Sequence, residues 1–196
     1  METSNLTKYQ SVNPVQRWLI DRFEKRLVEM VTKKRSIKKV IDVGCGEGFG
    51  MRNLKENNVG NQYLGIDASS KALKLGKKIN PGFSYHKGDI YRLPVNEDQA
   101  DLVMCCEVLE HLERPEEALS ELKRISKKYV LLSVPYEPWF RLMNFARGKY
   151  LKTLGNHPEH INWWGTRSFN KMVSKTLKVR RQITVLPWQI ILAESA

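Results

Sequence analysis

The sequence is poor in cysteine, with only Cys45, Cys105 and Cys106 among its 196 residues. An odd number of cysteines cannot all pair within one chain, and their spacing does not match the paired patterns of zinc sites. A disulfide framework is therefore excluded as the basis of this fold. We expect three reduced, largely buried thiols near strand ends.

Long apolar runs are also missing. No stretch approaches the roughly 18 residues that suggest a membrane-spanning helix, and residues 1–10 lack the hydrophobic core of a signal peptide. We therefore expect a cytoplasmic protein. With 196 residues, of which 41% are hydrophobic, the chain suits one domain. Within it, residues 1–36 are expected to form an N-terminal lid and helix, and residues 136–165 an inserted substrate cover.

Acidic residues are scarce relative to basic ones, at 21 against 33, which gives a formal net charge of +12. Such an excess is compatible with nucleic acid, an acidic membrane surface, an anionic substrate or a solvated lysine-rich surface. The lysines are spread along the chain, so charge alone does not choose. Residues 139–150 combine basic and aromatic side chains at helical spacing, which suits either a membrane interface or the roof of an apolar pocket. Peripheral membrane contact and RNA binding therefore stay open.

What the chain does contain is a strand that ends in an acid and a glycine-rich turn. Residues 40–48 read Val-Ile-Asp-Val-Gly-Cys-Gly-Glu-Gly, and a helical pattern follows. Glycines directly after a buried parallel strand allow a tight turn and a close approach to a ligand. The dinucleotide fingerprint spaces its glycines as G-x-G-x-x-G, whereas the spacing here is G-x-G-x-G.

Further strands alternate with helices and also end in acids. A strand over 62–67 ends at Asp67, which can accept hydrogen bonds from both hydroxyls of a ribose. A strand over 83–87 leads into Gly88-Asp89-Ile90. This alternation predicts an α/β fold with a doubly wound sheet whose ligands bind at the carboxyl ends of the strands. The other predicted strands are 100–105, 129–134 and a C-terminal hairpin of 178–185 and 189–193, and the other predicted helices are 14–32, 115–126 and 168–177.

In order and spacing these motifs resemble the class I S-adenosylmethionine-dependent methyltransferases, of the type 11 kind and nearest to those of ubiquinone biosynthesis. The resemblance covers about residues 38–135. It implies a Rossmann-like, seven-stranded, mostly parallel sheet with a C-terminal antiparallel hairpin, and S-adenosyl-L-methionine as cofactor with S-adenosyl-L-homocysteine as product. The glycine turn would hold the methionine half, Ala68 would lie against the adenine, and Asp89 and Ile90 would bind its amino group and a ring nitrogen. The implied cofactor-binding set is Asp42, Gly44, Cys45, Gly46, Gly48, Asp67, Ala68, Asp89, Ile90 and Cys105.

A second group of polar residues follows the strand over 100–105. Glu107, Glu110 and His111 stand at i, i+3 and i+4, so a helix would bring them to one face. With His160 they offer ligands for Mg²⁺, Mn²⁺ or Zn²⁺. The pattern resembles the metal site of small-RNA 3′-terminal 2′-O-methyltransferases and of ubiquinone-biosynthesis O-methyltransferases. Leu-Glu-His-Leu is also common in relatives that need no metal, so we expect none and keep these four residues as the alternative.

The resemblance implies methyl transfer to a small, apolar or aromatic acceptor, with O, N and C acceptors all open. If the acceptor carries a proton, a base must remove it, and His160 is the first candidate, followed by His157 and His111. Two other functions stay open. One is RNA methylation, including a metal-dependent 2′-O type, and the other is a non-catalytic subunit that binds the cofactor or a partner protein.

Overall fold

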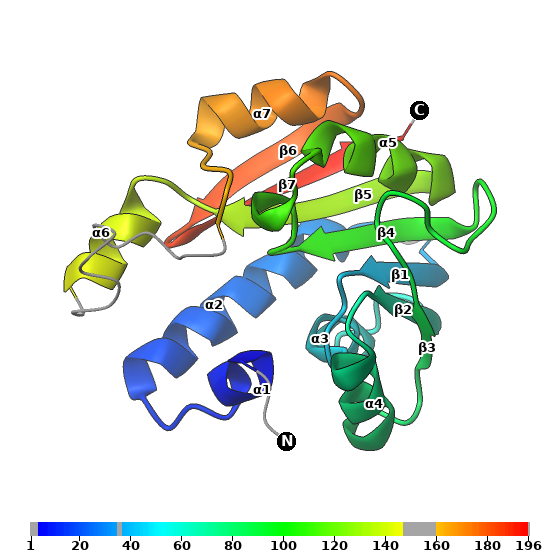
Figure 1. Ribbon diagram of the computed structural model, residues 1–196, viewed down its shortest axis with the longest axis horizontal. Helices are drawn as coiled ribbons and strands as arrows, with labels where there is room; N and C mark the ends of the chain where they lie inside the picture. The colour runs from blue at the N-terminus through cyan, green and yellow to red at the C-terminus, as the bar shows by residue number, and fades with distance from the viewer. Residues whose placement is uncertain (1–3, 35–36, 147–159, 196) are drawn as a thin grey trace.

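A seven-stranded sheet forms the centre of the computed structural model, which describes residues 4–34, 37–146 and 160–195 (Figure 1). The strand order is β3-β2-β1-β4-β5-β7-β6. The first five strands run parallel, and β7 pairs antiparallel with both β5 and β6. The strands are β1 Lys39–Val43, β2 Gln62–Asp67, β3 Ser84–Lys87, β4 Ala100–Cys106, β5 Ser126–Pro135, β6 Lys178–Val185 and β7 Trp188–Glu194.

Helices cover both faces of the sheet (Figure 1). One face packs against apolar residues of α2, α3 and α4, and the other against those of α5 and α7, which gives two separate core clusters. Strands β1, β4 and β5 are buried on both faces, which explains why their sequences read as continuous apolar runs. The helices are α1 Ser4–Tyr9, α2 Pro14–Val31, α3 Phe49–Glu56, α4 Ser70–Ile79, the 3₁₀ helix η1 Leu109–His111, α5 Pro115–Ile125, α6 Trp139–Ala146 and α7 Thr166–Ser174.

Local sequence accounts for the start of the long helix α2. The Asn13 side-chain oxygen accepts hydrogen bonds from the amides of Val15 and Gln16 at 3.0 and 3.1 Å, and Pro14 occupies the first helical position. An asparagine cap followed by proline is a strong start signal, because the cap satisfies free amides and proline has none to satisfy. The predicted helix over 14–32 is thus confirmed. The short helix α1 before it was not predicted.

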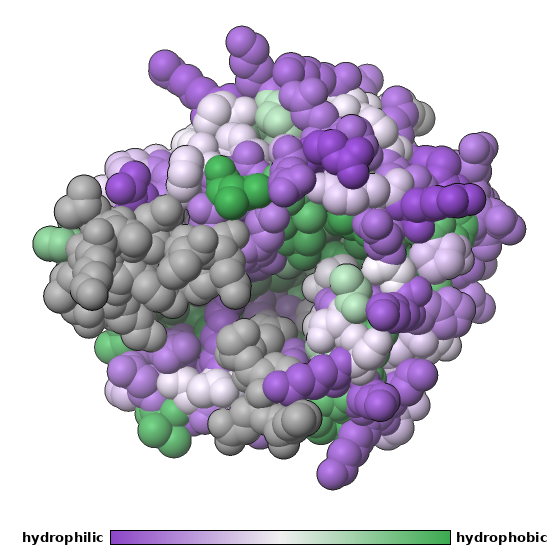
Figure 2. Space-filling model, viewed as in Figure 1, coloured by the Kyte–Doolittle hydropathy of each residue, from purple (hydrophilic) through white to green (hydrophobic). Residues whose placement is uncertain are grey.

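The direction of winding reverses between β1 and β4, which are neighbours in the sheet although β2 and β3 separate them in the chain. In doubly wound sheets the connections diverge at this point and leave a crevice beyond the carboxyl ends of the strands. Figure 2 shows the surface hollowed near the centre of the view, where β4 ends in Figure 1. The predicted fold class, including the C-terminal hairpin, is confirmed, and the topology places the glycine turn after β1 at this switch point.

Candidate functional site

The glycine turn after β1 is tight because three of its residues adopt positive φ angles. Gly44, Gly46 and Gly48 have φ values of 76°, 53° and 85°. A Cβ atom on Gly44 would lie only 2.3 Å from Val108 Cγ2, so no larger residue fits there without movement. The Gly44 amide donates to the Ile66 carbonyl at 2.7 Å, which ties the turn to the end of β2.

Asp67 joins the glycine turn to the start of helix α4. Its Oδ2 accepts a hydrogen bond from the Gly46 amide at 2.8 Å, and its Oδ1 accepts one from the Ser69 amide at 2.7 Å. Each carboxylate oxygen can accept more than one hydrogen bond, so both keep capacity for a ligand hydroxyl. Asp67 is half-buried, and Ala68 beside it is exposed. This geometry suits the predicted role of Asp67 as a ribose acceptor.

Asp89 and Ile90 follow β3 and lie at the same edge, because β3 pairs in parallel with β2. The Asp89 side chain is exposed, and its Oδ1 accepts a hydrogen bond from the Tyr91 amide at 3.0 Å. Ile90 is half-buried and packs against the core. An exposed carboxylate with remaining acceptor capacity, beside an apolar side chain, is a suitable environment for the amino edge and face of an adenine.

Two members of the predicted cofactor set do not offer their side chains to a ligand. Cys105 has no exposed surface and packs inside one core cluster, so only its backbone could contact a cofactor. Asp42 is also buried, at 4% exposure. Burial, and then the charge of Asp67, raise the pKa of Asp42 to about 8. The Asp42 carboxyl group therefore belongs to the buried support of the glycine turn and does not face a ligand. The predicted free thiols are confirmed, although Cys106 is only half-buried.

A second cluster lies beyond β4, but the predicted helical face is wrong in part. Only Leu109–His111 form a helix, a single 3₁₀ turn, and Glu107 precedes it with a φ of 59°. The left-handed backbone at Glu107 breaks the i, i+3 relation on which the prediction depended. The Glu107 carboxylate instead accepts a hydrogen bond from Ser133 Oγ on β5 at 2.9 Å.

Glu110, His111 and His160 do converge. Potential ligand atoms of the three side chains all lie within 4.8 Å of one another, and the two imidazole rings are 4.9 Å apart. Glu110 is 1% exposed, and its Oε2 has no hydrogen-bond partner in the part of the chain that the structure describes. Burial, and then the charge of Glu107, raise the pKa of Glu110 well above its usual range. One carboxylate and two imidazoles are a donor set that fits a divalent transition-metal ion such as Mn²⁺.

Asn162, which sequence reasoning missed, helps to fix His160 in this cluster. The amides of Ile161 and Asn162 donate to the Glu110 carbonyl at 3.0 and 3.1 Å. The Asn162 side-chain amide donates to the Leu112 carbonyl at 2.6 Å. These bonds join a segment far along the chain to η1. No sequence signal pointed to Asn162, since its partners are backbone atoms. His157, the second candidate base, lies outside the described residues.

The N-terminal helix α1 covers part of the site. The Tyr9 ring stacks on Phe49, the first residue of α3, with a centroid separation of 4.1 Å and an angle of 11°. The Lys8 ammonium lies 5.3 Å from the Trp188 ring, and its positive charge lowers the pKa of Glu107 and Glu110 against the effect of burial. The segment predicted as a lid thus packs beside the start of α3 through Tyr9 and brings a positive charge near Glu107 and Glu110 through Lys8.

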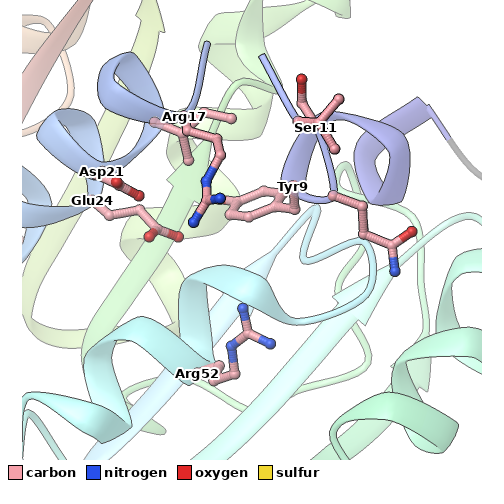
Figure 3. A pocket seen from close by; sticks show the side chains of 9 residues that line it. Tyr9, Ser11, Arg17, Asp21, Glu24 and Arg52 are labelled. Carbon is pink, nitrogen blue, oxygen red and sulfur yellow. The ribbon is translucent and has the colours of Figure 1, made fainter. Parts of the chain in front are cut away.

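A polar cavity of about 290 Å³ lies on the other side of Tyr9, between α2 and α3 (Figure 3). Arg17 and Arg52 point toward the Tyr9 ring in this view. Burial raises the pKa of Glu24, which also interacts with the Tyr9 hydroxyl. Sequence reasoning missed the cavity because its lining comes from three separate segments. The lining is Tyr9, Gln10, Ser11, Val12, Arg17, Ile20, Asp21, Glu24 and Arg52.

Comparisons with known proteins agree with this geometry. Residues 41–133, which carry the glycine turn, Asp67, Asp89 and the start of the second cluster, match the family model described as a methyltransferase domain. These residues are a class I methyltransferase domain. The match ends within β5, so the methyltransferase domain model does not include the segment that carries His160.

Curated relatives resemble the methyltransferase domain and its flanks. A mitochondrial ubiquinone biosynthesis O-methyltransferase from Schizosaccharomyces pombe is 30% identical over 148 residues, covering 69% of this chain and 50% of that protein. A ubiquinone biosynthesis O-methyltransferase from Nitrosospira multiformis is 31% identical over 133 residues, covering 63% and 49%. The chain thus spans about half the length of these relatives.

Solved structures share the fold of the methyltransferase domain. Magnesium protoporphyrin IX methyltransferase from Synechocystis PCC 6803, solved with bound S-adenosylhomocysteine, superposes with a TM-score of 0.70 and 18% identity. The match covers 96% of this chain and 91% of that one. At this identity the similarity concerns the fold alone.

The buried acid beneath the glycine turn generates a prediction about pH. Since the pKa of Asp42 is about 8 in the folded protein, against about 4 when unfolded, only the folded state keeps the proton between those values. The contribution of Asp42 to the free energy of unfolding should fall by about 1.4 kcal/mol for each pH unit in this window, and stay constant outside it. We expect the stability of Asp42→Asn relative to the wild type to rise from pH 4 to pH 8.

Urea denaturation of both proteins at matched pH values measures this difference, because all other titrating groups are shared. Parallel stability profiles for the wild type and Asp42→Asn would show that Asp42 is ionised in the folded protein at neutral pH.

Proposed function

We propose that this chain transfers the methyl group of S-adenosylmethionine to a hydroxyl oxygen of a small aromatic acceptor. The observation that carries the proposal is the arrangement of two polar clusters at one edge of the sheet. Asp67, Asp89 and the glycine turn form the first, and Glu110, His111 and His160 form the second. The names of the curated relatives, which are ubiquinone biosynthesis O-methyltransferases, support an oxygen acceptor.

The residues of the first cluster fit the cofactor. The Asp67 carboxylate has free acceptor capacity for ribose hydroxyls, and the exposed Asp89 carboxylate can accept from an adenine amino group. Because Gly44 has no side chain, the turn can pack tightly against Val108 and would offer backbone atoms to the methionine half. When bound, the cofactor supplies a methyl group on a positively charged sulfur. The task of the protein is then to align the acceptor oxygen with that methyl and to remove its proton.

The surroundings of the second cluster suit an aromatic acceptor. The Phe140 ring lies 5.2 Å from the His160 ring and is half-buried. An aromatic side chain beside polar groups can stack on a planar ring while the hydroxyl of that ring faces the carboxylate and imidazoles. His160 is 7% exposed, so water has little access to it. His160 is therefore the group that we propose to orient the acceptor hydroxyl.

We also propose that the second cluster holds a divalent metal ion. The residues that would hold it are Glu110, His111 and His160, and the Glu110 oxygen that lacks a hydrogen-bond partner among the described residues supports this fit. A bound ion would lower the pKa of an acceptor hydroxyl and orient it. Glu107 is turned toward Ser133 and takes no direct part in this set.

RNA methylation and a non-catalytic binding role rank below this proposal. The net charge of +12 is compatible with RNA, but the Phe140 ring beside His160 favours a small ring. The open acceptor capacity of Asp67 and Asp89 favours cofactor use over a purely structural role.

Removal of the Asp67 carboxylate tests the cofactor assignment. Asp67→Ala should weaken S-adenosylmethionine binding by about 1.5–3 kcal/mol, because charge-assisted hydrogen bonds to the ribose are lost. Isothermal titration calorimetry measures this change. Unchanged affinity would refute the ribose assignment.

Asp89→Ala is the matched comparison, since it removes a carboxylate from the neighbouring strand end. It should weaken binding too, and should reduce discrimination against cofactor analogues that are altered at the adenine amino group. Because Asp67 also holds the glycine turn, the Asp67→Asn variant, which keeps one acceptor oxygen, separates ligand contact from local folding.

Chelation tests the metal assignment. We expect a chelator to abolish methyl transfer while S-adenosylmethionine binding stays intact, and Mn²⁺ or Mg²⁺ to restore turnover in the wild type. Glu110→Gln should prevent restoration, because the buried carboxylate is the charged ligand of the set. Glu113→Gln, an exposed acid on the same loop, is the control and should respond like the wild type.

A metal-free mechanism gives the opposite result. If chelator has no effect while His160→Ala lowers the catalytic rate by about 10²–10⁴-fold, His160 acts alone as a base and the metal proposal is wrong.

A further inference from the structure

Two helices expose apolar side chains that the core does not use. On α2 and the turn before it, Val12, Val15 and Trp18 are 94%, 61% and 57% exposed. The opposite side of α2 is fully engaged, because Leu19, Phe23 and Leu27 are buried in the core. The outward apolar side chains of α2 are therefore additional to those that stabilise the fold.

Helix α6 repeats this arrangement. Trp139, Leu142 and Phe145 are 45%, 55% and 47% exposed, and they recur at three-residue spacing, which keeps them on one side of a helix. The inward side of α6 is used, since Phe140 contacts the His160 ring and Met143 packs against the core cluster that contains Leu19 and Phe23. Helix α6 thus has one side toward the site and one apolar side toward solvent.

The two exposed sets lie at the same end of the molecule. In Figure 1 the start of α2 and the whole of α6 both lie at the left of the view. Figure 2 shows hydrophobic side chains at this end among hydrophilic ones. We call this end, defined by Val12, Val15, Trp18, Trp139, Leu142 and Phe145, the apolar rim.

Basic side chains accompany the apolar rim. Arg22 lies over the Trp18 ring at 5.4 Å, and Lys25 and Arg26 continue along the exposed side of α2, with Arg26 in an ion pair with Glu29 at 2.6 Å. Exposed aromatic and aliphatic side chains next to arginine and lysine are typical of helices that lie in a membrane interface. Tryptophan favours this interface because its ring is apolar and its N–H group can reach water or lipid head groups.

We propose that the apolar rim docks on an anionic lipid bilayer. The charge of +12 complements such a surface, whereas it opposes the approach of a second copy of the same chain. Nucleic acid would match the charge but leaves no role for exposed valine, leucine and phenylalanine. None of the helices in the part of the chain that the structure describes combines the length and hydrophobicity needed to cross a bilayer.

Docking at the apolar rim would bring the inner side of α6, with Phe140 beside His160, close to the lipid surface. An acceptor dissolved in the membrane would then reach the second cluster without crossing bulk water. This consequence rests on the proposed function, whereas the docking itself does not.

Vesicle flotation without cofactor tests the docking. Wild-type protein should float with vesicles of phosphatidylcholine mixed with phosphatidylglycerol, bind less to phosphatidylcholine alone, and be released by high salt. The double variant Trp18→Glu/Leu142→Glu should lose about tenfold or more in affinity, since it replaces one apolar side chain on each helix by a negative charge. Both positions are exposed, so circular dichroism should show an unchanged fold.

Ile79→Glu is the matched control, because Ile79 is an exposed apolar residue, at 37%, on the distant helix α4. This control should bind vesicles like the wild type. The proposal is overturned if anionic vesicles do not bind the wild type or if the double variant binds them equally well. It is also overturned if the double variant changes only the oligomeric state or only RNA binding, which would assign the apolar rim to another partner.

Discussion

The Asp67 carboxylate makes the contact on which the rest of the site depends. By accepting hydrogen bonds from the Gly46 and Ser69 amides, it joins the glycine turn, the end of β2 and the start of α4. The turn can approach Asp67 only because its glycines adopt positive φ angles and Gly44 has no side chain to meet Val108. The buried Asp42 lies beneath the same turn and is affected by the charge of Asp67. One carboxylate therefore links the local backbone geometry, the electrostatics and the proposed cofactor contacts.

Much of this region could be predicted because its determinants are local. Apolar runs that end in an acid or a glycine mark the parallel strands, and the parallel register brings Asp67 and Asp89 to one edge whatever the details of packing. The second cluster was harder to predict. Its histidines come from segments 49 residues apart in sequence, and the positive φ of Glu107 turns that side chain away from the helical position that its spacing suggested. Asn162, α1 and the polar cavity depend on tertiary contacts that leave no periodic pattern.

The two clusters are built differently, and this difference suits different tasks. The first cluster consists of backbone amides and partly or fully exposed carboxylates, which can exchange water for ligand hydroxyls with little loss of free energy. The second cluster buries Glu110 next to Glu107, and the positive charge of Lys8 offsets only part of the electrostatic cost. Carboxyl groups whose pKa is raised by burial and by a neighbouring acid are typical of active sites, which makes the second cluster the better candidate for chemistry. Helix α1 packs on Phe49 through Tyr9, and the charge of Lys8 acts on Glu107 and Glu110.

Transfer of a labelled methyl group is the most direct test of the proposed methylation of a small aromatic acceptor. The protein would be incubated with methyl-labelled S-adenosylmethionine and with separated lipid-soluble, RNA and water-soluble metabolite fractions of a cell extract. We expect label in small aromatic molecules of the lipid-soluble or metabolite fractions with wild-type protein, and much less label with Asp67→Ala when the cofactor concentration is close to the wild-type Kd. Label confined to RNA, or cofactor binding without transfer to any fraction, would contradict the proposed methylation.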